Sequence, residues 1–113
     1  METLVKIKEV DHSVIEEIVN RVLQSVQPEK IILFGSHAYG QPHEGSDLDI
    51  LVIVKSDLPR YKRAVPIYKA LAGLLIPKDV LVYTSEEIEA WAEVPQAFIT
   101  AVMNKGKVIY EEK

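Results

Sequence analysis

Three aspartates are the residues of this sequence whose type and spacing could carry out a reaction. Asp47 and Asp49 enter one apolar segment together, and Asp79 opens a later one. Alternate residues of a strand share one face, so Asp47 and Asp49 are expected to point the same way. Three carboxylates that converge repel one another unless cations lie among them. Oxygen ligands of this kind suit magnesium, which proteins hold with a few carboxylates and the phosphates of a substrate.

A Gly-Ser pair supplies the complementary part of such a site. Gly35-Ser36 follows a short apolar run, and ten residues separate it from Asp47. Glycine lets the backbone approach a ligand closely, and a serine hydroxyl and turn amides can donate hydrogen bonds to phosphate oxygens. Phosphates that are held by metal ions and face a turn of small residues are the arrangement of phosphoryl or nucleotidyl transfer.

Each part also has an ordinary structural explanation. A Gly-Ser pair after a strand is commonly a turn, and an Asp-x-Asp at a strand entry is commonly a solvated loop end. An aspartate that opens a strand, as Asp79 does, is commonly a turn residue. The combination in this order indicates a site instead. Asp49 strengthens that interpretation, because a carboxylate within a continuous apolar strand needs a partner or a metal ion.

Other catalytic patterns are missing or incomplete. Segment 35–40 has the glycine spacing of a P-loop, but Gln41-Pro42 stands where that motif needs lysine and serine or threonine. The chain has no cysteine, which excludes a disulfide, a thiolate zinc site and a cysteine nucleophile. His12, His37 and His43 lack zinc-site spacing, and we interpret each as a surface or loop histidine. A substrate role stays open for His37 and His43, which flank the candidate site.

The elements that must position these residues follow from the apolar pattern. A helical stripe predicts a helix over 11–26, with Asp11 or Ser13 as its cap and a capping box of Ser13 with Glu16. The other expected elements are strands over 31–34, 48–54 and 79–83, a helix from Asp57 to Leu75 that Pro66 interrupts, a turn over 88–91 capped by Thr84 and Glu87, a helix over 96–103 with a glycine C-cap at Gly106, and an edge strand over 108–110. This order predicts an α/β (α+β) domain with helices packed on a small mixed sheet, formed by residues 1–113 as one unit.

Composition narrows the function classes. The chain has 113 residues, of which 48% are hydrophobic and 27% charged, as in one ordinary globular domain. A net charge of −4 disfavours direct nucleic-acid binding, which depends on neutralising phosphates. The first ten residues contain no apolar signal-peptide core, so we expect a cytoplasmic protein without membrane association.

Two further groups of residues have open interpretations. Three basic residues follow Asp57: Arg60, Lys62 and Arg63. They form either a solvated helix face or a contact for a triphosphate or an acidic partner. Three aromatic residues in the second half of the chain are expected in the core, with an interface as the alternative: Trp91, Phe98 and Tyr110.

The Gly35-Ser36 pair, Asp47-Leu48-Asp49 and the later Asp79 together resemble the signature of the DNA polymerase beta nucleotidyltransferase superfamily. More narrowly, essentially the whole chain resembles the minimal nucleotidyltransferases, the short MNT-domain proteins of bacteria and archaea. The resemblance implies a polymerase beta-like palm fold. It implies that Asp47 and Asp49 hold two Mg²⁺ ions bridging the triphosphate, and that Asp79 completes the metal site and helps deprotonate the attacking hydroxyl. Gly35 and Ser36 would hold the β- and γ-phosphates.

The same resemblance implies a function and a partner. The activity would be transfer of a nucleoside monophosphate, AMP from ATP, to a hydroxyl of a partner protein. The chain would act as the antitoxin of a HEPN-domain toxin, in a homo- or hetero-oligomer. The alternative is a catalytically degenerate module that neutralises its partner by binding alone. Family members commonly read Gly-Ser-x-Ala-Arg-Gly, and Tyr39 replaces that arginine here. The intact carboxylates favour the enzyme, and Tyr39 favours the binding module.

Overall fold

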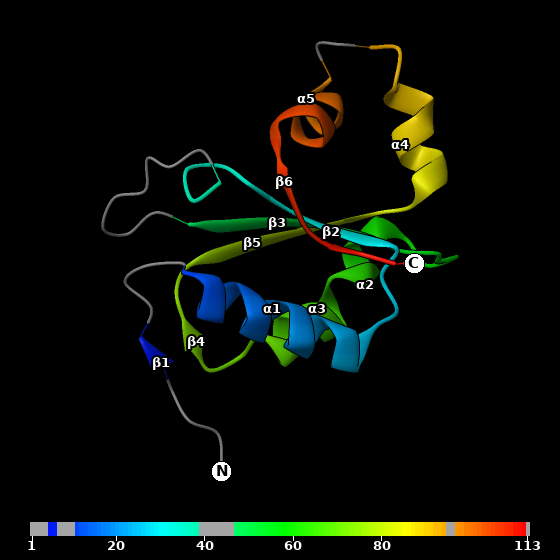
Figure 1. The fold of residues 1–113 in the computed structure, drawn as a ribbon. Coiled ribbons are helices and arrows are strands. Elements are labelled where there is room, and N and C mark those ends of the chain that lie inside the picture. Colours follow the sequence, from blue (N-terminus) through cyan, green and yellow to red (C-terminus); the bar gives the residue numbers. More distant parts are fainter. Residues whose placement is uncertain (1–4, 7–10, 39–46, 95–96, 113) are drawn as a thin grey trace.

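A four-stranded mixed sheet with helices on both faces forms the centre of the protein (Figure 1). The computed structural model describes residues 5–6, 11–38, 47–94 and 97–112. The strands lie in the order β5-β3-β2-β6. β2 pairs antiparallel with β3 and with β6, and β3 pairs parallel with β5. Their bounds are β2 Lys30–Phe34, β3 Leu48–Ile53, β5 Lys78–Tyr83 and β6 Lys107–Glu111. The predicted α/β class is therefore confirmed, and β6 is the expected edge strand.

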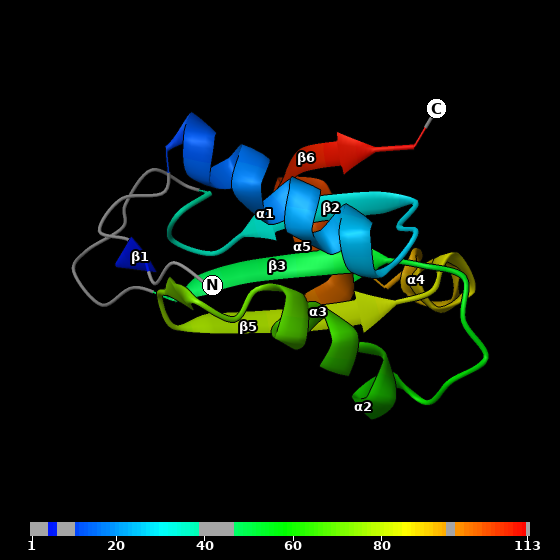
Figure 2. The same ribbon diagram turned by 90° about the horizontal axis from the view of Figure 1, so that it is seen from below.

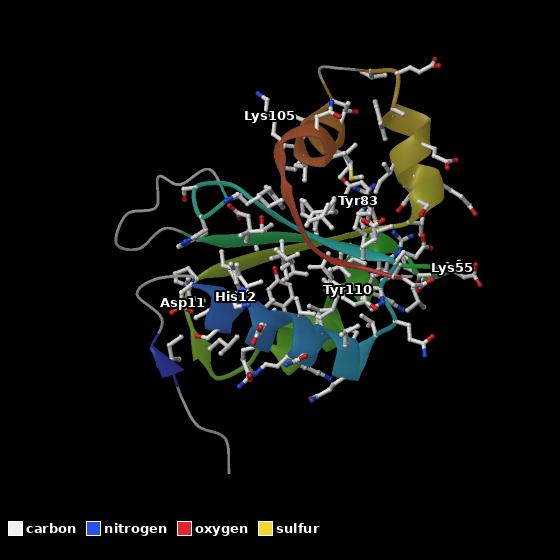
Figure 3. All side chains as sticks on the ribbon, viewed as in Figure 1. Asp11, His12, Lys55, Tyr83, Lys105 and Tyr110 are labelled. Carbon is white, nitrogen blue, oxygen red and sulfur yellow. The ribbon has the colours of Figure 1, made fainter. Side chains whose placement is uncertain are left out.

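Helices α1 (His12–Ser25) and α3 (Val65–Ala70) cover one face of the sheet, and α4 (Ser85–Trp91) and α5 (Phe98–Lys105) lie on the other (Figure 2). Alternate strand residues point to opposite faces, so each strand contributes to two cores. Figure 3 shows Tyr110 on the α1 side and Tyr83 on the α4–α5 side. The buried strand residues toward α1 and α3 are Ile31, Leu33, Leu48, Ile50, Val52, Val80 and Val82, and those toward α5 are Ile32, Phe34, Leu51 and Ile53.

Asp11 caps helix α1, which is one of the two alternatives that the sequence predicted. Its carboxylate accepts hydrogen bonds from the Val14 amide at 3.0 Å and from the Ser13 hydroxyl at 2.8 Å. These bonds lower the pKa of Asp11. Because Asp11 is the N-cap, the predicted capping box of Ser13 with Glu16 does not form. Glu16 instead lies 2.9 Å from exposed His12, which confirms His12 as a surface histidine.

The segment between β3 and β5 differs from the single interrupted helix that we predicted over 57–75. It contains two short helices, α2 (Arg60–Arg63) and α3, and then strand β4 (Leu74–Leu75). Pro66 lies in the first turn of α3, where a missing N–H costs nothing, so the proline starts a new helix. Gly73 has φ of 96°, a left-handed conformation that ends the helical path before β4. β4 pairs parallel with β1 (Val5–Lys6), and neither strand was predicted.

The ends of the remaining helices confirm one predicted cap and correct another. Thr84 and Glu87 form the expected capping box at the start of α4. Gly106 ends α5 with φ of −71°, so it is not a left-handed glycine cap. The reason for glycine is close packing, because a Cβ there would overlap the side chain of Ile32 and the carbonyl of Val102.

The prediction of aromatic core residues holds for only part of the set. Tyr110 packs against the core under α1. Trp91 and Phe98 are 49% and 59% exposed, so the core interpretation is wrong for both. Trp91 ends α4 and Phe98 begins α5, and no further layer of the described chain covers either side chain completely. None of the helices in the described residues has the length and apolar character needed to cross a membrane.

Replacing Gly106 with alanine should destabilise the protein. The added methyl group would overlap Ile32 and the backbone of Val102, and overpacking of this kind costs about 1–3 kcal/mol. Urea unfolding followed by circular dichroism would measure the loss. Asn104→Ala, at an exposed position of the same helix, is the matched control and should change the free energy of unfolding very little. Equal stabilities for Gly106→Ala and the wild type would contradict the packing explanation.

Candidate active site

Asp49 and Asp79 lie side by side at the start of two neighbouring parallel strands. The register of β3 with β5 pairs Asp49 with Asp79, and the register of β2 with β3 pairs Phe34 with Asp49. Phe34, Asp49 and Asp79 therefore form one row across three strands, which we call the carboxylate row. The expectation that the strand of Asp79 neighbours the strand of Asp49 is confirmed by this register.

The carboxylate row faces the α5 side of the sheet. Asp49 and Leu51 are two residues apart in β3, so they share a face, and Leu51 is buried toward α5. Ile50, which lies between them, is buried on the opposite face, toward α1. In β5, Asp79 shares its face with Leu81, which packs on the same core as Leu51. Both carboxylates of the row therefore lie on the same face as α5.

The carboxylate of Asp49 is held in an unfavourable environment for a negative charge. Burial raises its pKa, and the charges of Asp79 and Asp47 raise it further. His37 acts in the opposite direction and lowers it. The three aspartates are therefore near enough to interact, with Asp49 half-buried and Asp47 and Asp79 exposed. Among the described residues, however, no three acidic or histidine side chains are gathered into a ready-made metal cage.

Lys78, the neighbour of Asp79 in sequence, does not neutralise these charges. Its ammonium group donates a hydrogen bond to the carbonyl of Leu74 at 3.0 Å. Burial also lowers the pKa of Lys78. Successive strand residues point to opposite faces of a sheet. Lys78 therefore contacts the segment of β4, on the face opposite to that of Asp79 and the carboxylate row.

Gly35 brings the backbone directly against the carboxylate of Asp49. Its φ of 77° is left-handed, and a Cβ at this position would overlap the Oδ2 atom of Asp49. Only glycine satisfies both conditions. Beyond it the chain turns, and the amide of Ala38 donates a hydrogen bond to the Gly35 carbonyl at 3.0 Å. Ser36 lies half-buried within this turn, next in sequence to the glycine that contacts Asp49.

The turn also contains a residue whose place the sequence left open. His37 is half-buried and close enough to Asp49 to lower the pKa of that carboxyl group. The available signal in the sequence was the position of His37 directly after Gly35-Ser36. The direction in which its side chain points, however, depends on the conformation of the turn. His43 and Tyr39 lie outside the described residues.

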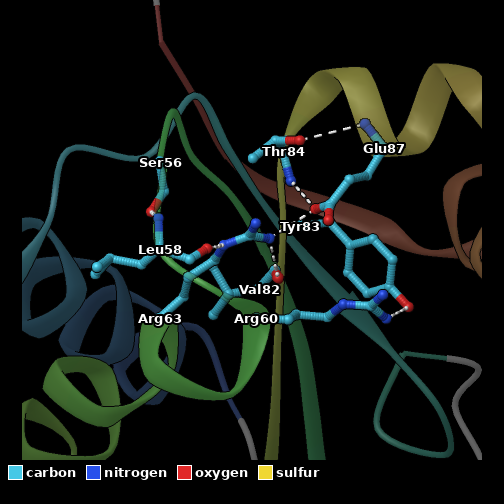
Figure 4. A network of polar contacts seen from close by, with 8 residues as sticks. All are labelled: Ser56, Leu58, Arg60, Arg63, Val82, Tyr83, Thr84 and Glu87. Atoms are coloured by element: carbon cyan, nitrogen blue, oxygen red, sulfur yellow. Dashed lines mark hydrogen bonds and ion pairs between the residues drawn. The ribbon is translucent and has the colours of Figure 1, made fainter.

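The basic residues after β3 lie at the other end of the sheet, so they do not contact a triphosphate at the carboxylate row. Arg63 donates hydrogen bonds to Glu87 at 2.6 Å and to the carbonyl of Leu58 at 2.7 Å (Figure 4). Arg60 donates to the Tyr83 hydroxyl at 2.8 Å, and its guanidinium lies 4.5 Å from the centre of that ring. Both arginines tie α2 to the end of β5. Arg60 and Lys62 are exposed, as a solvated helix face requires, whereas Arg63 is half-buried.

Three hollows of the surface lie at this far end as well. Their volumes are about 360, 560 and 740 Å³, all three share Glu29 in their lining, and the largest also contains Lys55 and Thr84. These residues flank the ends of the strands remote from Asp49 and Asp79. The candidate site is identified by the chemistry of its side chains.

Comparison with known proteins identifies the chain as a nucleotidyltransferase. The sequence pattern of the Nucleotidyltransferase domain family matches residues 15–108, and the chain belongs to this family. The chain is 33% identical over 78 residues to the candidate protein adenylyltransferase MJ0141 of Methanocaldococcus jannaschii. The match covers 69% of this chain and 75% of that protein.

Solved structures share the fold. A toxin–antitoxin complex with AMP-PNP matches with a TM-score of 0.63 and 21% identity, over 88% of this chain and 74% of that one. A mutant of the toxin–antitoxin MntA–HpeT matches with a TM-score of 0.62 and 19% identity, over the same shares. A candidate nucleotidyltransferase from Sulfolobus solfataricus matches with a TM-score of 0.61 and 22% identity, over 87% of this chain and 78% of that one.

Replacing Asp49 with asparagine should stabilise the metal-free protein at neutral pH. The raised pKa means that the folded state binds a proton more tightly than the unfolded state does. The wild type should therefore lose stability as the pH rises from below the ordinary aspartate pKa through the raised pKa of Asp49. The variant should lack that part of the decline. Urea unfolding in the presence of a chelator, from about pH 3.5 to pH 7.5, would measure it.

Asp57→Asn is the matched control, since Asp57 is exposed and remote from the row. It should leave the pH dependence of the wild type in place. A variant Asp49→Asn that is less stable than the wild type at neutral pH would show that the carboxylate is not held against an electrostatic cost.

Proposed function

We propose that this chain transfers AMP from ATP to a hydroxyl group of a partner protein, in a reaction that depends on Mg²⁺. The observation that carries the proposal is the pairing of Asp49 with Asp79. Gly35 lies beside this pair, at a position where any side chain would overlap the carboxylate of Asp49. Carboxylates that repel one another are suited to a cation, and a backbone pressed against them is suited to phosphate.

The donor set fits magnesium. Asp47 and Asp49 are the proposed ligands of two Mg²⁺ ions, and Asp79 completes the site. The ions would offset the burial and the carboxylate repulsion that raise the pKa of Asp49, and they would supply positive charge to the α- and β-phosphates. The MntA–HpeT relative was solved as a mutant in which two aspartates, spaced as Asp-x-Asp, are replaced by glutamate. That choice of positions supports the assignment of Asp47 and Asp49.

The chain's own residues have distinct tasks in the proposed reaction. Gly35 and Ser36 hold the β- and γ-phosphates through the turn amides and the serine hydroxyl. Asp79 accepts the proton of the acceptor hydroxyl. The hydroxyl oxygen bonds to the α-phosphorus, the bond from that phosphorus to the bridging oxygen breaks, and pyrophosphate leaves. Positioning and charge stabilisation provide the catalysis, as in other phosphoryl transfers.

A partner protein must present the acceptor in this proposal. Two of the solved relatives are toxin–antitoxin complexes, and a curated relative is named for protein adenylylation. These names support a toxin as the partner and the antitoxin as the role of this chain, and the resemblance of the sequence to minimal nucleotidyltransferases implies that the toxin has a HEPN domain.

A second candidate function is neutralisation by binding alone. Tyr39 favours it, because an arginine at that position would offset the charge of the carboxylates and tyrosine cannot. The two functions differ in whether the partner is chemically modified.

Intact-mass spectrometry of the chain mixed with its HEPN-type partner, ATP and Mg²⁺ would separate them. We expect the partner to gain one or more AMP units. Asp49→Asn should reduce the rate by about 10²-fold or more, since it removes charge that the transition state requires. Asp57→Asn is the control and should transfer AMP as the wild type does. A partner that stays unmodified in a stable, inhibited complex would favour the binding module.

Tyr39→Arg tests the departure from the family pattern. If the missing arginine limits the reaction, this variant should transfer AMP faster with the three carboxylates unchanged. Steady-state rates of pyrophosphate release would measure the gain. No gain in a folded variant would mean that Tyr39 is neutral or serves another purpose.

A further inference from the structure

An apolar wall borders the carboxylate row on the α5 face of the sheet. The row behind Asp49 and Asp79 contains Leu51, which is fully buried, and Leu81, which packs on the same core. Phe34, at the β2 end of the carboxylate row, is also buried. These side chains are covered within the core under α5, so a ligand at the row can meet only the part of this apolar cluster that reaches the surface.

Phe98 extends this wall out to solvent. It is the first residue of α5 and is 59% exposed. Its ring lies edge-on to Phe34, with the ring centres 5.8 Å apart and the planes at 76°. Phe34 is the register partner of Asp49, so Phe98 lies one aromatic ring away from the carboxylate row.

The helix that carries this ring is anchored to the core. The next residues, Ile99 and Thr100, are buried, and the Thr100 hydroxyl donates a hydrogen bond to the Trp91 carbonyl at 2.7 Å. Ile99 and Val102 anchor α5 on the core beneath. Phe98 is therefore a held aromatic ring with much of its surface open, rather than a side chain on a free loop.

We propose that Phe98 stacks on the base of the nucleoside triphosphate bound at the carboxylate row. The inference rests on the proposed function and adds the base subsite to it. A nucleotide is charged at one end and flat and apolar at the other, as this surface is. Stacking accepts any base because every base has a π-face, so Phe98 contributes affinity without selecting one base.

Other exposed apolar residues are less suited to this role. Trp91 and Val94 are 49% and 38% exposed near the junction of α4 and α5. Within the described residues, Phe98 reaches the carboxylate row through the contact of its ring with that of Phe34. Trp91 therefore serves as a matched control, an exposed aromatic residue without that contact.

Titration calorimetry with two ligands, ATP and inorganic tripolyphosphate, each with Mg²⁺, tests the proposal. Phe98→Ala should weaken ATP binding about tenfold, in the range that removal of one stacked aromatic produces. It should leave tripolyphosphate binding unchanged, because that ligand has no base. Phe98→Tyr should restore ATP affinity, Phe98→Leu should not, and Trp91→Ala should bind ATP as the wild type does.

Each other result overturns the inference. Unchanged ATP binding by Phe98→Ala would show that the ring does not contact the base. The same conclusion would hold if this variant bound ATP normally and lost only its association with a partner protein. An equal loss for ATP and tripolyphosphate would show that Phe98 acts through the shape of the site. A wild type that binds neither ligand would overturn the proposed function as well, so the two failures are distinguishable.

Discussion

The parallel pairing of β3 with β5 is the constraint on which the rest of the structure depends. It places Asp49 opposite Asp79, and it can form only if the chain crosses from the end of one strand to the start of the next. Helices α2 and α3 and strand β4 make that crossover. Because they pass over the α1 face, the α5 face is left with the carboxylate row and the two C-terminal helices.

The two ends of the sheet have opposite electrostatic characters. At the start of β3 and β5, burial and the neighbouring carboxylates raise the pKa of Asp49, so the ionised site costs stability. At the far end, Arg63 pairs with Glu87 and lowers the pKa of that carboxyl group, while Glu87 also closes the capping box with Thr84. The compensated charges hold α2, β5 and α4 together. The charges that repel one another are at the end where a cation and a triphosphate are proposed to bind.

The strands and their chemistry could be predicted from the sequence better than the connections between them. Apolar runs and the Asp-x-Asp spacing were sufficient for β2, β3 and β5, and Thr84 with Glu87 was sufficient for the start of α4. The crossover was mispredicted because Pro66 is compatible with a kink or with a new helix, and the tertiary pairing of β4 with β1 decides between them. The roles of Arg60 and Arg63 could not be predicted either, since their partners lie 23 and 24 residues away along the chain.

The order of residues across the carboxylate row also gives the proposed reaction a direction. Gly35 follows β2, Asp49 lies in β3, and Asp79 lies in β5 at the edge of the sheet. An in-line transfer needs the attacking and leaving oxygens on opposite sides of the phosphorus. With the phosphates held at the β2 turn, the leaving pyrophosphate is on that side, and the acceptor must approach from the β5 edge. Asp79 is exposed at that edge, where it can meet a hydroxyl group presented by another protein.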